Sequence, residues 1–144
     1  MFLTLLLGAA ILVTPSPADR ALIFESAGFT SATGEYLMCD EETPLGLVVR
    51  DFNGDGRLDA IVTDGGSSCY GNAGNGFTLL THTSMRKWTR LFSSEGTPTF
   101  LKSRANGWPD LEIGGPGECF RVLRWNGKTF ADHRHHYEGK PCKP

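Results

Sequence analysis

The sequence lacks an apolar run long enough to cross a bilayer as a helix, which takes about 20 residues. Its longest apolar run covers residues 2–13, and no second run follows it. The small residues Ser16 and Ala18 come next at the spacing of a signal-peptidase site, although no Lys or Arg precedes the run. We interpret residues 1–18 as a removed export signal and expect no membrane anchor. The alternative is a buried N-terminal strand or helix.

Cysteine pairs of the C-x-x-C type are also missing, which argues against zinc binding and thiol redox chemistry. The four cysteines are widely spaced, at Cys39, Cys69, Cys119 and Cys142. In an exported chain an even number of cysteines indicates disulfides, and four cysteines allow three pairings. We favour Cys39–Cys69 with Cys119–Cys142, because each bond then closes within one half of the chain. The expected compartment is periplasmic or extracellular.

Catalytic motifs are equally scarce. The serines at 67–68 lack the G-x-S-x-G context of a nucleophilic serine. Glycoside hydrolysis needs two carboxylates at a set distance, and the sequence does not give that distance for the acidic residues at 40–42. His133, His135 and His136 form a histidine cluster in which two imidazoles on a strand could hold zinc or copper. Surface histidines beside a terminal disulfide are the interpretation we favour. We therefore do not expect an enzyme.

Lysine is absent from residues 19–83, where three arginines face ten acidic residues, whereas residues 84–144 contain 11 basic and six acidic residues. The C-terminal half could therefore bind an anion, or the two halves could dock and neutralise each other, which we favour. Tryptophans beside these cations could form a platform on which a sugar or nucleic-acid base stacks. We favour the alternative that they belong to a packed aromatic core, and we do not expect nucleic acid as a partner. The candidate partner-binding residues are Lys102, Arg104, Trp108, Arg121, Arg124 and Trp125.

Long helical patterns are missing too, and 18 glycines favour turns. Short β-prone runs bounded by turns occur at 45–49, 58–63, 77–81, 88–92, 97–101, 111–113, 120–125 and 129–133. Only residues 19–27 look helical, with Asp19 as the cap and Gly28 as the end. Asn126-Gly127 predicts a hairpin with a type I′ turn. The sequence therefore predicts one small, mainly β domain over residues 19–144, an antiparallel meander with a short N-terminal helix; α+β is the alternative.

Two stretches about fifty residues apart share a pattern. Residues 56–62 (GRLDAIV) lead through paired glycines to Cys69, and residues 107–113 (GWPDLEI) lead through paired glycines to Cys119. An Asn-Gly pair follows in both cases. We expect two degenerate repeat halves, about 19–83 and 84–144; the alternative is the ordinary succession of strands and turns in a glycine-rich β protein.

The strongest chemical signal is the segment 51–59, DFNGDGRLD, in which oxygen-bearing side chains occupy positions 1, 3, 5 and 9 and Gly56 makes the bend. Calcium takes six to eight oxygen ligands, and alternate residues of a tight loop can supply them. The ligands would be Asp51, Asn53, Asp55 and Asp59 through their side chains and Arg57 through its carbonyl oxygen. Position 12 is Val62 and not the Glu of an EF-hand, so water or Asp64 would complete the shell. A solvated Asp/Asn/Gly turn is the alternative.

This loop resembles the FG-GAP or VCBS-type repeat, D-x-[DN]-G-D-G-x-x-D, found between strands in propeller blades and in many exported bacterial proteins. The resemblance implies one structural calcium ion, with activity usually located elsewhere. The chain is too short to close a propeller of several blades. The wider sequence is similar to a group of small exported proteobacterial proteins, which implies a periplasmic or secreted setting and no particular reaction.

The second half has no such loop, because Lys102, Arg104 and Asn106 fall opposite Asp51, Asn53 and Asp55 when Asp59 is aligned with Asp110. We expect no calcium there, and an anion is the alternative ligand. The predicted function is an exported, calcium-stabilised, non-catalytic binding module that acts as a monomer on an unidentified protein or envelope component. The alternative is a small periplasmic hydrolase or hydrolase inhibitor acting on cell-wall material.

Overall fold

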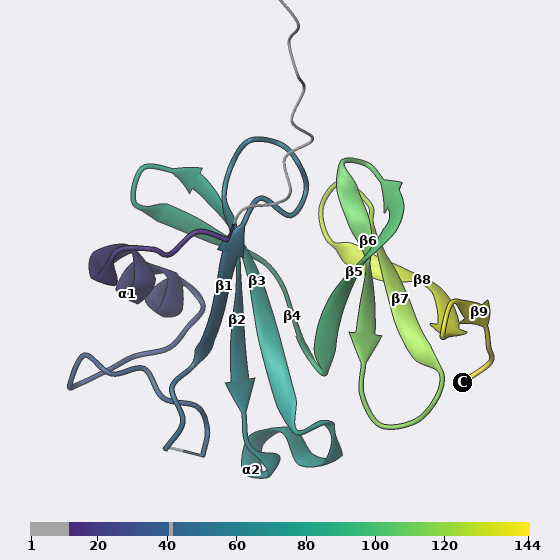
Figure 1. Ribbon diagram of the computed structural model, residues 1–144, viewed down its shortest axis with the longest axis horizontal. Coiled ribbons are helices and arrows are strands. Elements are labelled where there is room, and N and C mark those ends of the chain that lie inside the picture. The colour runs from purple at the N-terminus through teal and green to yellow at the C-terminus, as the bar shows by residue number, and fades with distance from the viewer. Residues whose placement is uncertain (1–11, 41) are drawn as a thin grey trace, which may run out of the picture.

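The computed structural model describes residues 12–40 and 42–144, which form two antiparallel sheets and one main helix (Figure 1). The elements are α1 (Pro17–Ser26), β1 (Gly46–Arg50), β2 (Asp59–Gly65), α2 (Ser67–Tyr70), a 3₁₀ turn (Gly71–Ala73), β3 (Asn75–Ser84), β4 (Lys87–Glu95), β5 (Thr97–Ala105), β6 (Trp108–Gly114), β7 (Phe120–Trp125), β8 (Phe130–Tyr137) and β9 (Lys140–Pro141). The first sheet has the order β1-β2-β3-β4 and the second the order β5-β6-β7-β8-β9. The predicted fold class, a mainly β meander, is confirmed. Most of the predicted export signal, residues 1–11, lies outside the described residues.

The two sheets join at Gly96, so β4 belongs to the first sheet and the division lies well beyond residue 83. Gly96 has φ 102°, a backbone conformation that favours glycine. Its N–H donates to the carbonyl of Asn75 over 2.8 Å, and the Asn75 side chain donates back to the Gly96 carbonyl over 2.9 Å. This junction places the second meander directly after the first.

Helix α1 starts two residues before the predicted start. Its N-cap is Ser16, whose hydroxyl accepts the N–H of Asp19 over 3.2 Å, and Pro17 occupies the first turn, where proline needs no hydrogen bond. The predicted capping role of Asp19 is therefore wrong. Before the helix, the N–H of Val13 donates to the carbonyl of Val49 on the β1 edge over 2.9 Å. The short helix α2 was not predicted.

The predicted type I′ turn at Asn126-Gly127 is also wrong. Trp125 pairs with Phe130 across a four-residue loop, in which the Asn126 side chain accepts two backbone N–H groups. Among residues 126–129 only Gly127 has a positive φ. A tight two-residue turn occurs instead at Asn106-Gly107, where both residues have positive φ, 54° and 91°.

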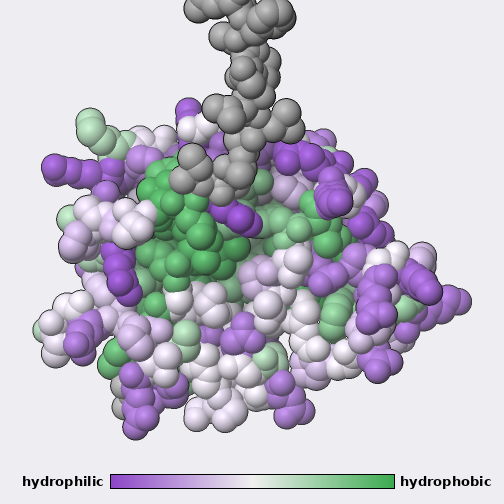
Figure 2. Space-filling view, in the orientation of Figure 1, coloured by the Kyte–Doolittle hydropathy of each residue, from purple (hydrophilic) through white to green (hydrophobic). Residues whose placement is uncertain are grey.

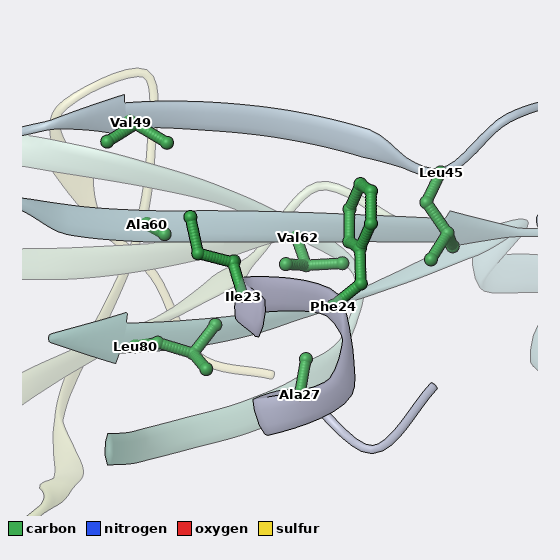
Figure 3. Packing of buried hydrophobic residues seen from close by; sticks show 8 residues of the cluster. All are labelled: Ile23, Phe24, Ala27, Leu45, Val49, Ala60, Val62 and Leu80. Atoms are coloured by element: carbon green, nitrogen blue, oxygen red, sulfur yellow. The ribbon is translucent and has the colours of Figure 1, made fainter. Parts of the chain in front are cut away.

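Helix α1 covers one face of the first sheet (Figure 3). Ile23, Phe24 and Ala27 of the helix pack against Leu45 and Val49 and against Ala60, Val62 and Leu80 of β2 and β3. In Figure 2 the hydrophobic surface gathers over this region, between α1 and the β1 edge. The first sheet thus buries alternate side chains against a helix, as period-two patterning requires.

The other face of the first sheet packs against the second sheet. Ile61, Phe77 and Leu79 share this second core with aromatic and aliphatic residues of the second sheet: Trp108, Leu111, Ile113, Leu123 and Phe130. The molecule is therefore layered in the order α1, first sheet, second sheet (Figure 1). The two halves dock through apolar side chains, and the ion pairs of the described residues all lie within the second sheet.

Two disulfides close the loops outside the sheets. Cys39 bonds Cys69 with their Cα atoms 6.3 Å apart, and Cys119 bonds Cys142 with their Cα atoms 5.8 Å apart. The favoured pairing is confirmed. Each bond lies within one half of the chain, and each closes a loop of 20 to 30 residues, which stabilises a small domain by restricting its unfolded state. No helix within residues 12–40 and 42–144 is long and apolar enough to span a membrane.

Candidate calcium loop and its counterpart in the second sheet

The candidate calcium loop, residues 51–59, connects β1 to the first residue of β2. Gly54 and Gly56 have φ values of 79° and 84°, which a side chain would disfavour. Asp51 fixes the bend, because one carboxylate oxygen accepts the N–H of Gly54 and the other accepts the N–H of Gly56, both over 2.8 Å. The glycines at these two positions therefore allow the chain to wrap around the Asp51 carboxylate.

The next two candidate ligands make similar local bonds. The Asn53 oxygen accepts the N–H of Asp55 over 3.2 Å, and an Asp55 oxygen accepts the N–H of Arg57 over 2.8 Å. In the part of the chain that the structure describes, no group of three or more His, Cys, Asp or Glu residues is arranged to hold a metal ion. The candidate oxygens are thus aimed at backbone N–H groups and do not form a ready coordination shell.

Asp59 closes the loop from inside the protein. It is fully buried, and its two oxygens accept the N–H of Phe52 over 2.9 Å and the hydroxyl of Thr81 over 2.7 Å. Burial raises the pKa of Asp59 to about 6, and the negative charges of Asp55 and Asp51 add to the rise. No basic side chain of the described residues forms an ion pair with it. The negative charge of this carboxylate is therefore poorly compensated.

Asp110 has the corresponding place near the start of β6, and its surroundings are the opposite. It is also fully buried, but Arg124 donates two hydrogen bonds of 2.9 Å to it and Arg134 donates one of 3.0 Å. Ser103 adds a bond of 2.6 Å. The Arg124 guanidinium, followed by Ser103 and Arg134, holds the pKa of Asp110 well below its usual range, against the opposing effect of burial.

Ser103 and Arg134 were missed in the sequence. Ser103 lies on β5, seven residues before Asp110 in the sequence, and Arg134 lies on β8, 24 residues after it. The available signal was the alternation along β8, which places Arg134 and His136 on one face. Which face this is depends on the pairing register, and a local pattern does not determine that register.

Asp64 cannot complete the candidate calcium shell, which corrects the sequence-based suggestion. It lies five residues further along the extended β2, at roughly 3.3 Å per residue. There its side chain accepts the N–H of Cys39 over 2.8 Å and the hydroxyl of Tyr70 over 2.9 Å. Burial, together with the Asp64 carboxylate, raises the pKa of Tyr70 to about 12. Asp64 thus supports the disulfide-linked loops at the far end of the strand.

The tryptophans of the candidate partner surface belong to the core. Trp108 is 6% exposed, and its ring lies 6.0 Å from Trp125 and 5.7 Å from Phe130, measured between ring centroids. Trp125 is partly buried against the same cluster. The preferred alternative, a packed aromatic core, therefore describes these residues.

The four basic residues of that set do not gather on one surface. Arg124 is bound to Asp110, and Arg121 pairs with Asp132 over 2.9 Å. Arg104 extends toward the first sheet, where it donates to the carbonyl of Asn53 over 2.6 Å. Lys102 is exposed on β5. Arg104 is thus a polar link between the candidate calcium loop and the second sheet.

Two further candidates contain no assembled catalytic or metal group. His136 is hydrogen-bonded to Glu112, and within the described residues the histidine cluster does not form a metal-binding group. A hollow beside α1 is lined by Glu35 and Glu42, but both side chains are exposed. A carboxyl acid catalyst needs shielding from water to stay protonated, so this pair does not provide one as it stands.

Comparisons with known proteins found no counterpart: no family model matches the chain, and neither the curated proteins nor the solved structures include a match.

Proposed function

We propose that this protein is an exported, calcium-stabilised binding module without catalytic activity, made of two degenerate repeats of the FG-GAP or VCBS type. One structural calcium ion would bind the loop of the first repeat. The observation that carries the proposal is the contrast between Asp59 and Asp110. Two arginines neutralise the buried Asp110, whereas the buried Asp59 has two more carboxylates near it and no ion pair with any basic side chain of the described residues.

A bound cation would resolve this imbalance. Asp51, Asn53, Asp55 and Asp59 would offer side-chain oxygens and Arg57 its carbonyl oxygen. Each carboxylate oxygen that now accepts one backbone N–H keeps a second lone pair for a metal. The ion would supply structural stability and no reaction step. Because the twelfth-position Glu is missing, we expect a dissociation constant near ~10⁻⁴ M, which suits extracytoplasmic calcium concentrations.

The export part of the proposal rests on the two disulfides, since such bonds persist in oxidising compartments. The partner would be a protein or a component of the cell envelope. The buried tryptophans do not offer a stacking surface to it. The exposed loops are among the surfaces open to this partner.

The experiment is thermal unfolding of the oxidised protein in calcium and in chelator. Calcium at 100 times its dissociation constant should stabilise the fold by about 2.7 kcal/mol. Asp55→Ala should abolish most of this gain and change the melting temperature little in chelator. Asp40→Ala is the matched control, because Asp40 makes the same kind of local turn outside the loop. It should lower the melting temperature equally in both conditions. Equal losses for Asp55→Ala in calcium and chelator would refute the metal site.

A further inference from the structure

A second hollow lies between the candidate calcium loop and the hairpin formed by β3 and β4. Its volume is about 310 Å³. The lining residues are Gly56, Arg57, Leu58, His82, Thr83, Ser84 and Met85. They contribute one guanidinium, one imidazole and two hydroxyl groups, all of which can donate hydrogen bonds, and no carboxylate.

Specific contacts hold the two sides of this hollow together. The N–H of His82 donates to the carbonyl of Leu58 over 2.9 Å, and the hydroxyl of Thr81 donates to Asp59 over 2.7 Å. The His82 ring also stacks on Trp88, with ring centroids 4.9 Å apart. The imidazole is therefore positioned by the sheet, and Arg57 comes one residue before the Leu58 carbonyl that bonds His82.

The hairpin side of the hollow carries only positive charge, whereas on the loop side Arg57 lies close in sequence to Asp51, Asp55 and Asp59. All ion pairs of the described residues lie in the second sheet, so none of them neutralises Arg57. Residues 65–94, which include the whole hairpin tip, contain Arg86, Lys87 and Arg90 and no Asp or Glu. A guanidinium beside hydroxyl and imidazole donors is a typical arrangement for binding phosphate oxygens.

We propose that this hollow binds a phosphate group, either of a soluble phosphorylated molecule or of a lipid headgroup. Its volume is at the low end for small-molecule sites, so it fits the phosphate and its immediate substituent. The Arg57 guanidinium provides the main charge, with His82 and Ser84 as further donors. Met85, which is 90% exposed, leaves one side open for the rest of the ligand.

Calcium should strengthen this binding, a step that rests on the proposed function. The carboxylates of Asp51, Asp55 and Asp59 repel an anion at the neighbouring hollow, and a calcium ion would offset two of their charges. The carbonyl of Arg57 would also be held by the ion. By linkage, calcium and phosphate must then raise each other's affinity by the same factor.

The test is a titration of the full chain with methyl phosphate, a monoester that avoids calcium phosphate precipitation. Binding is measured by calorimetry and by the NMR chemical-shift changes of the amides around Arg57 and His82. Arg57→Gln keeps the backbone carbonyl for calcium and removes the guanidinium, so methyl phosphate affinity should fall at least about tenfold. Arg86→Gln is the matched control, because it removes the same charge from the tip of the β3–β4 hairpin, at a residue that does not line the hollow. Its affinity should stay within about twofold of the parent.

Equal losses in the two variants, or no binding of methyl phosphate, would overturn the proposal. Calcium affinity is measured separately, so phosphate binding without calcium binding would reject the proposed function and keep this site. Calcium binding without phosphate binding would do the reverse. Vesicles containing phosphatidic acid form the second arm: capture that depends on Arg57 identifies a lipid headgroup, and methyl phosphate binding without such capture identifies a soluble ligand.

Discussion

Asp110 lies fully buried beneath two guanidinium groups, and its contribution to stability should therefore depend on pH. Its pKa is lowered in the folded protein, chiefly by the Arg124 guanidinium, while an unfolded chain has the ordinary value near 3.9. A lowered pKa means that the ion pairs stabilise the fold above about pH 4 and that this stabilisation is lost as the pH falls toward the folded value. Asp110→Asn should cost about 3 kcal/mol at neutral pH and progressively less below pH 4, as measured by urea unfolding.

The control for this prediction is Asp132→Asn. Asp132 pairs with Arg121, but its side chain is 67% exposed, so solvent screens the interaction. We expect a loss below about 1 kcal/mol. A cost of Asp110→Asn that is the same at acidic and neutral pH would show that shape or hydrogen bonding, and not charge, makes this aspartate important.

At the scale of the elements, the junction between β4 and β5 depends on one glycine. A Cβ atom on Gly96 would lie 2.5 Å from the carbonyl oxygen of Gly114 and 2.8 Å from the Ile113 side chain, and φ is 102°. Gly96→Ala should lower the free energy of unfolding by at least about 2 kcal/mol. In Gly115→Ala the new methyl group would meet open space, and the change should stay within about 0.5 kcal/mol. Comparable effects of both substitutions in chemical denaturation would contradict this account.

The start of α1 makes the predicted export signal testable. We expect the mature chain to begin at Asp19, which mass spectrometry of the exported protein would establish. Processing there removes the Ser16 cap and the Val13 contact with the β1 edge, so a chain starting at residue 12 should be more stable by about 1 kcal/mol or more. A mature N-terminus at or before Val13 would contradict the predicted cleavage and would make both contacts permanent parts of the fold.

Most elements were predictable because they depend on local sequence. All eight predicted strands are present, since β-prone runs between glycine-rich turns form strands wherever a core can cover one face. The turn at Asn126 was mispredicted because its side chain bonds backbone N–H groups, an option that the Asn-Gly pair alone does not reveal. The candidate calcium ligands are similarly local. The arginines of Asp110 are not, because strand register and the choice of face bring them together.

At the scale of the whole molecule, the order of the layers determines which faces of the two sheets are buried in a hydrophobic core. The first sheet is covered by α1 on one face and by the second sheet on the other. The outer face of the second sheet contains Asp110 with its arginines and the pair of Glu112 and His136. The second sheet therefore presents charged side chains, and not an apolar surface, on its outer face.

This arrangement predicts a monomer. Burying the outer face of the second sheet against another copy would desolvate Arg124 and Arg134, which are 34% and 36% exposed, without offering them new partners, which is unfavourable. Leu12 and Val13, which are 66% and 38% exposed, lie within the predicted export signal and would be absent from the mature chain. Light scattering after size-exclusion chromatography should therefore give the mass of one chain, 15.7 kDa less the export signal, at micromolar and near-millimolar concentrations. A mass that rises toward that of two chains would contradict this prediction. If the charged outer face is then the subunit interface, Arg134→Ala should shift the monomer–dimer equilibrium, whereas Arg86→Gln on the distant hairpin should not.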